Sequence, residues 1–142
     1  VILHLTATLT HAVRARRTRE PIVGYSRAVR VGNAIKVSGT TSVDSDGKVL
    51  HVGDVAAQTR QCFAIIEKGL DGVGGKLKAS APRFWFRPHL LRHCKDIVRT
   101  RMFVTDISQW EAVGRVHGEL FGAIRPACSM VQASLPALVS AS

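Results

Sequence analysis

The sequence predicts an α+β domain, with a mostly antiparallel sheet and two helices packed on one face. Short runs that alternate or favour β-branched residues indicate strands, and two longer stretches repeat apolar residues every three or four positions, as amphipathic helices do. These signals occur in the order β-β-β-α-β-α-β, with hairpins first, which favours α+β over a parallel α/β arrangement. The 142 residues suit one domain.

The first predicted element is a hairpin. Its strands are the runs 25–31 and 34–38, and Gly32-Asn33 between them tolerates the positive φ angles of a two-residue turn. A second turn at Asp46-Gly47 leads into a short strand over 48–50.

The first helix is predicted to begin after Asp54, whose carboxylate can cap its free N–H groups. Its apolar positions recur at helical spacing: Val55, Thr59, Cys62, Phe63, Ile66 and Leu70. The stretch "GLDGVGG" supplies glycines for the C-terminal end. Cys62 is expected to be a core residue.

A strand over 97–104 follows, with Ile97, Arg99, Arg101 and Phe103 on one face and Val98, Thr100, Met102 and Val104 on the other. Ser108 and Glu111 have the spacing of a capping box. The helix they would open carries an apolar stripe: Trp110, Val113, His117, Leu120 and Phe121. Pro126 precedes a last strand over 127–133.

The two helices can cover only one face of this sheet. Since no other part of the chain is predicted to cover the second face, we expect the protein to associate with itself. His117 is expected to be a core or interface histidine rather than a catalytic one.

The net charge of +10 suggests a nucleic-acid partner, but its distribution weakens that interpretation. Residues 1–20 carry +3, residues 79–95 carry +4, and the rest of the chain, with 12 basic and 9 acidic residues, carries only +3. Three cysteines without a CxxC pair fit a reducing compartment. No apolar run reaches the roughly 18 residues of a membrane helix, so a cytoplasmic protein without a membrane partner is expected.

Residues 1–20 are interpreted as a divergent or disordered N-terminus, and residues 21–142 as the single domain. The first segment is rich in Arg and Thr and poor in acids, which also fits a mitochondrial transit peptide. Both interpretations stay open.

Residues 79–95 interrupt the pattern and are interpreted as an insertion. Without them, "GGKLK" would lead directly into the strand at 97–104 through a loop of ordinary length. Two alternatives remain: Trp85 and the neighbouring arginines could stack on single-stranded nucleic acid, or His89, His93 and Cys94 could bind zinc. No further Cys or His pair at recognisable spacing completes such a zinc site, and no metal or cofactor is expected.

Several stretches together resemble the RidA/YjgF family of imine and enamine deaminases, also named after a reported endoribonuclease. They are "VGYSRAVRVGNAIKVSGTTSVDSDGKV", "DVAAQTRQCFAIIEKGL", "DIVRTRMFVTDISQWEAVGRVHGELFG" and "IRPACSMVQASLP". The resemblance covers residues 23–78 and 96–136. It implies a chorismate-mutase-like fold and a homotrimer with small metabolites bound in clefts between subunits. The hydrolysis it implies needs no cofactor.

The resemblance also implies which residues line the cleft. Tyr25 and Ser38, with Gly39, match the family's tyrosine and its Ser-Gly pair. The family's last-but-one strand reads Pro-Ala-Arg-Ser-Cys-Val-Glu, and its arginine binds the substrate carboxylate through two parallel hydrogen bonds. Here Cys128 stands in place of that arginine and Met130 in place of the cysteine.

Two further departures concern the rest of the cleft. Gly114 stands where some members carry an asparagine, and the family's closing strand with its glutamate is absent, so the C-terminus is interpreted as shortened. Arg101, Arg99 and Arg125 are candidates to replace the lost cation, with solvated or ion-paired arginines as the alternative. The predicted activity is that of a 2-iminobutanoate/2-iminopropanoate deaminase-like hydrolase; the alternatives are a non-catalytic ligand-binding trimer and an RNA-binding protein or endoribonuclease.

Overall fold

The computed structural model describes residues 11–13, 22–75 and 97–134. Three N-terminal strands form an antiparallel sheet in the order β1-β2-β3, with bounds His11–Val13, Ala28–Val31 and Ala34–Val37. The predicted hairpin is confirmed: β2 and β3 pair from Ala28↔Val37 to Val31↔Ala34, and Gly32 takes the positive φ of the turn, at +55°.

The predicted third strand over 48–50 is wrong. Val49 makes only an isolated antiparallel bridge to Val43, because the turn at Asp46-Gly47 is closed mainly by Asp44, whose carboxylate accepts from the backbone N–H groups of Asp46 and Lys48. The third strand of the sheet is instead β1, which lies within the segment 1–20 and pairs with β2.

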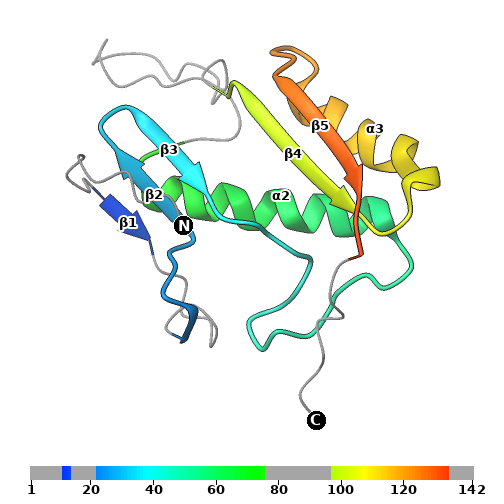
Figure 1. The fold of residues 1–142 in the computed structure, drawn as a ribbon, viewed down its shortest axis with the longest axis horizontal. Helices are drawn as coiled ribbons and strands as arrows, with labels where there is room; N and C mark the ends of the chain where they lie inside the picture. Colours follow the sequence, from blue (N-terminus) through cyan, green and yellow to red (C-terminus); the bar gives the residue numbers. More distant parts are fainter. Residues whose placement is uncertain (1–10, 14–21, 76–96, 135–142) are drawn as a thin grey trace, which may run out of the picture.

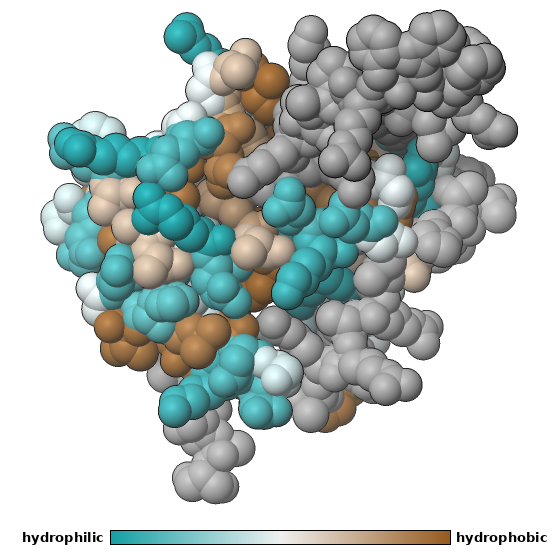
Figure 2. All heavy atoms as spheres, turned by 180° about the vertical axis from the view of Figure 1, so that it is seen from behind, coloured by the Kyte–Doolittle hydropathy of each residue, from teal (hydrophilic) through white to brown (hydrophobic). Residues whose placement is uncertain are grey.

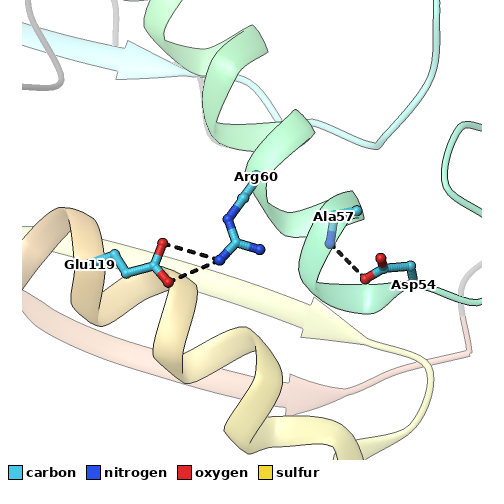
Figure 3. Close-up of polar contacts among 4 residues, drawn as sticks. All are labelled: Asp54, Ala57, Arg60 and Glu119. Atoms are coloured by element: carbon cyan, nitrogen blue, oxygen red, sulfur yellow. Dashed lines mark hydrogen bonds and ion pairs between the residues drawn. The ribbon is translucent and has the colours of Figure 1, made fainter.

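Helix α2, Val55–Gly72, runs alongside both groups of strands (Figure 1). Its beginning and end are as predicted. The Asp54 carboxylate accepts from the Ala57 N–H at 2.9 Å, and Gly74, at φ +73°, follows the last turn. Figure 3 shows this cap one turn before Arg60, which pairs with Glu119 of the second helix.

The C-terminal part of the fold is a strand-helix-strand unit. Strand β4, Arg99–Val104, leads through a 3-10 turn, Ile107–Gln109, into helix α3, Trp110–Phe121, and then into β5, Ala127–Gln132. Since α3 carries the chain back to its starting end, β5 pairs with β4 in parallel. With two antiparallel strand pairings and this parallel one, the described strands are mostly antiparallel, and the α+β class is confirmed.

Two predictions about α3 are wrong. Asp106, rather than a Ser108–Glu111 box, caps the segment: its carboxylate accepts from the Ser108 N–H and Oγ, at 2.9 and 2.6 Å. These bonds and one from Gln109 lower the pKa of Asp106. Trp110 does not join the buried stripe and is 55% exposed, whereas Val113, Val116 and Phe121 are buried.

Both helices lie on one side of the strands, behind them in Figure 1. Seen from behind, the helix side carries hydrophilic side chains and separate hydrophobic patches (Figure 2). The opposite side of β4 and β5 is exposed as predicted: Phe103 and Val131, which are register partners, are 59% and 49% exposed. This uncovered surface, which we call the outer face, also carries Arg99 and Arg101.

Residues 76–96 and 135–142 lie outside the described residues, and with them the predicted insertion, its zinc and nucleic-acid alternatives and the shortened C-terminus. So does most of the segment 1–20. Among the helices that the structure describes, none is long and apolar enough to cross a membrane.

Candidate functional site

Four polar side chains and one backbone carbonyl group gather where the N-terminal hairpin begins and ends, around the guanidinium of Arg27. Arg27 donates to the Gly39 carbonyl at 2.8 Å, to Thr40 Oγ1 at 3.2 Å and to Tyr25 Oη at 3.2 Å. We call Tyr25, Arg27, Ser38, Gly39 and Thr40 the Arg27 cluster. It therefore contains three residues that the sequence pointed to as cleft residues, Tyr25, Ser38 and Gly39.

The hairpin register explains why residues 13 positions apart meet. Because Ala28 pairs with Val37, the residues just before β2 lie beside those just after β3. The ladder continues one step further, with the Ser38 N–H donating to the Arg27 carbonyl at 3.0 Å. The Ser38 hydroxyl then donates to the Ser26 carbonyl at 2.7 Å, which fixes its side chain.

Helix α2 lies beneath this cluster. Cys62 Sγ lies 3.6 Å from the Thr40 carbonyl, and burial raises the pKa of the Cys62 thiol to about 11. The thiol is therefore neutral at physiological pH, as expected for a packing residue. Gly69 lets the helix approach closely: a Cβ there would lie 3.1 Å from Arg27 Cγ.

A second group lies in the β4–β5 pair. Cys128 and Met130 are register partners of Thr100 and Met102, so the four side chains share one face of the pair. That face is the one toward α3, because Thr100 Oγ1 lies 2.9 Å from Nε2 of His117 on that helix. Cys128 is exposed and Met130 half-buried. The predicted pairing of thiol and thioether on one face is therefore present.

His117 packs inside the unit as predicted. Its ring lies 4.6 Å from that of Phe121 and 6.3 Å from that of Phe63, and burial among them lowers its pKa. The neutral imidazole that results is held by Thr100. This arrangement is that of a packing histidine with a satisfied hydrogen bond.

The three candidate replacement arginines lie elsewhere. Arg99 and Arg101 alternate with Thr100 along β4 and so lie on the outer face, away from Cys128 of the same chain. Arg125 is exposed in the turn before β5, at φ +48°. Within one chain, Arg99 and Arg101 therefore do not lie on the face that carries Cys128.

Gly114 lies on α3 in a space bordered by Trp110. A Cβ at Gly114 would lie 3.9 Å from Cε3 of the Trp110 ring, an ordinary contact. The structure therefore has room for a Cβ at Gly114 beside the indole ring of Trp110.

Sequence reasoning missed Arg27. It is 5% exposed, and buried arginines are rare enough to mark a site. The available signal was its position: a charged residue immediately before β2, two residues after the single tyrosine. Among the residues that the structure describes, no group of three His, Cys, Asp or Glu side chains could hold a metal ion.

Comparisons with known proteins find relatives over most of this chain. A family model described as Endoribonuclease L-PSP matches residues 16–139. Over 118 residues the chain is 32% identical to 3-aminoacrylate deaminase RutC of Acinetobacter baylyi. The aligned region covers 83% of this chain and 80% of RutC.

Solved structures show the same fold. Rv2704 of Mycobacterium tuberculosis, a member of the YjgF/YER057c/UK114 family, has a TM-score of 0.67 and 38% identity, over 89% of this chain and 86% of that one. RidA from an Antarctic Psychrobacter has a TM-score of 0.62 and 27% identity, over 94% and 90% of the two chains.

Proposed function

This chain belongs to the RidA/YjgF family, whose model is described as Endoribonuclease L-PSP, and from that membership we propose that it acts on small imine or enamine metabolites. The proposed reaction is hydrolysis: water adds to the C=N carbon, the C–N bond breaks, and ammonia leaves as a carbonyl forms. The chemistry needs no bound metal, because an imine carbon is already electrophilic.

The observation that carries the proposal is the Arg27 cluster. It holds the Tyr25 and Ser38 hydroxyls, both half-buried, in fixed positions through bonds of 3.2 and 2.7 Å. Fixed hydroxyl groups can orient a small polar ligand without reorganising when it binds. RutC, an aminoacrylate deaminase by name, supports a substrate with a C–N bond of this kind.

The exposed Cys128 separates this chain from the family pattern. A thiol cannot form the two parallel hydrogen bonds by which a guanidinium binds a carboxylate. Losing such a contact costs on the order of 2–5 kcal/mol in binding. We therefore propose a substrate other than the usual amino-acid-derived imines, recognised mainly through uncharged groups.

We further propose a homotrimer with its clefts between subunits. The Arg27 cluster lies at the ends of β2 and β3, whereas Cys128 and Met130 lie on β5, in the other sheet of the same chain. The exposed Phe103 and Val131 on the outer face support a subunit contact there. A small ligand would touch both groups where one subunit's cluster faces its neighbour's strands.

The primary experiment supplies 2-iminopropanoate, formed in situ by an amino-acid oxidase, and measures ammonia release. Release well above the buffer rate, lost in Tyr25→Phe and Ser38→Ala, supports the deaminase. A rate equal to buffer in the wild type contradicts deamination of this probe and favours the alternative, a non-catalytic ligand-binding trimer, for which the missing guanidinium is the supporting observation.

Cys128→Arg sharpens the same experiment. If Cys128 occupies the position of the carboxylate-binding arginine, this variant should increase kcat/KM for 2-iminopropanoate at least tenfold. Cys128→Met, which removes the thiol at the same position without adding a guanidinium, is the matched control. An unchanged rate in Cys128→Arg would place residue 128 outside the substrate's reach.

The trimer is tested by light scattering after size exclusion, with Phe103→Asp expected to give monomers.

The cytoplasmic location, with the mitochondrion as the alternative, is likewise a proposal, tested by imaging a C-terminal fluorescent fusion. RNA binding has less support, since residues 1–20 and 79–95 carry +7 of the net charge of +10 and the rest of the chain is nearly balanced.

A further inference from the structure

The hydrogen bonds of the Arg27 cluster have a fixed direction. A guanidinium N–H can only donate, so Tyr25 Oη must accept the 3.2 Å bond from Arg27. The phenolic proton is therefore left for a different partner. Among the described residues, no hydrogen bond uses this proton.

Ser38 has the opposite direction. Its single hydroxyl proton is donated to the Ser26 carbonyl at 2.7 Å. Its Oγ lone pairs therefore remain as acceptors, and no bond within the described part of the chain uses them. Since Ser38 and Tyr25 are both half-buried rather than buried, a ligand can reach them.

From this geometry we infer that Arg27 is a positioning residue that makes Tyr25 a hydrogen-bond donor, and that the site takes ligands with an oxygen acceptor facing Tyr25 and an N–H donor facing Ser38. The inference rests on the proposed imine or enamine chemistry and narrows it. An enamine or imine N–H conjugated to, or adjacent to, an uncharged carbonyl oxygen carries both groups.

The surroundings of Arg27 fit a positioning role. The guanidinium is buried, and besides Tyr25 it binds the Gly39 carbonyl and Thr40 Oγ1, the two residues that follow Ser38. One side chain thus fixes both hydroxyl-bearing segments. Arg27 Cζ, the central carbon of the guanidinium, lies 5.6 Å from the Tyr25 ring centroid, so the positive charge also lies close to the phenol.

The first test needs no ligand. Because the chain has a single tyrosine, the intensity ratio of the tyrosine Raman doublet, which separates accepting from donating phenols, reports Tyr25 alone. We expect a stronger acceptor signature than that of N-acetyltyrosinamide in water. It should fall in Arg27→Met and persist in Arg27→Lys, which keeps a cationic donor.

Arg30→Met is the matched control. Arg30 lies on β2, three residues after Arg27, but its guanidinium donates to the carbonyls of Gly32 and Val73, at 3.0 and 3.1 Å. The signature should therefore survive in that variant. A wild-type ratio no higher than that of the free amide would overturn the inference, even if Arg27→Met failed to fold; so would an unchanged ratio in folded Arg27→Met.

The second test is a double-mutant cycle on ammonia release from 2-iminopropanoate. Tyr25→Phe should lower kcat/KM roughly tenfold, about the worth of one hydrogen bond. If Arg27 acts through Tyr25, the Arg27→Met change should add little in the Tyr25→Phe background. Fully additive losses would overturn the positioning role. Absence of wild-type turnover would instead contradict deamination of this probe, and the Raman result would still decide the inference.

Discussion

The two ends of the described fold differ in how polar their buried groups are. Around the N-terminal hairpin the interior is partly polar: beside the buried Ala28 and Val73, Arg27 is also buried, and hydroxyl, carbonyl and guanidinium groups form hydrogen bonds there. In the unit from β4 to β5 the interior is apolar and aromatic, with Phe121, Val113 and Val116 almost completely buried. One end is therefore held by directed bonds and the other by packing.

The difference shows where ligand chemistry can change without loss of the fold. Phe121 and Val116 are almost completely buried, whereas Cys128 of the same unit is exposed. Substitutions at residue 128 can therefore alter recognition at little cost in stability. The Arg27 cluster allows no such freedom, because each member satisfies a polar group of another.

The largest expected effect breaks the apolar end. Phe121 is 2% exposed and its ring meets that of Phe63 edge-on at 5.3 Å. Phe121→Ala should lower the free energy of unfolding by about 3–5 kcal/mol, from lost burial and the cavity left behind. Urea denaturation at fixed protein concentration measures this loss. A change below about 1 kcal/mol would show that packing does not hold this end.

The next effect concerns the polar end. Arg27→Met keeps much of the volume but leaves the Gly39 carbonyl and Tyr25 without their donor, which should cost about 2 kcal/mol. The control is Arg60→Met. Arg60 pairs with Glu119 at 2.9 Å, but both side chains are more than half exposed (Figure 3), so its loss should cost about 0.5 kcal/mol or less. Equal effects in the two variants would contradict the comparison.

A smaller effect concerns α2, the helix shared by both ends. Asp54→Ala removes the carboxylate that accepts from the Ala57 N–H and should cost about 1 kcal/mol. Asp46→Ala, in the exposed turn that Asp44 closes, is the control and should be nearly neutral. Urea denaturation followed by circular dichroism compares the two, and an Asp54→Ala change no larger than the control would contradict the cap.

The smallest effect is a pH dependence. Burial lowers the pKa of His117 from its ordinary value of 6.5, so the unfolded chain takes up this proton at a higher pH than the folded one. The stability that neutral His117 provides is therefore complete above pH 6.5 and lost as the pH falls below it. His117→Gln, which can still bind Thr100, should flatten this part of the profile. A profile identical to wild type would contradict it.

The sequence predicted the apolar end better than the polar one, for a physical reason. Apolar residues at helical or strand spacing indicate which face is buried, and this located α2, α3 and the faces of β4 correctly. Trp110 fits the stripe by spacing, yet it is 55% exposed. The spacing predicted Ser108 as the cap, whereas Asp106 caps the 3-10 turn that precedes α3.

The candidate site depended on resemblance rather than pattern. Tyr25 and Ser38 carry no periodic signal, and only the hairpin register reveals that they meet at Arg27. A hydropathy pattern cannot reveal a buried arginine, because it predicts that every arginine is exposed to solvent. The face on which Cys128 lies could be predicted from alternation, but its position opposite Thr100 could not, because strand pairing is a long-range property.

Because of that parallel register, the length of the turn at residues 122–126 determines which face of the strand pair each β5 side chain lies on. Side chains in a strand alternate between faces, so inserting or deleting one residue in this turn would rotate Ala127, Ser129 and Val131 toward α3 and carry the thiol to the other side. Loop length and residue identity are thus two separate routes by which descendants of this chain could acquire a new ligand preference.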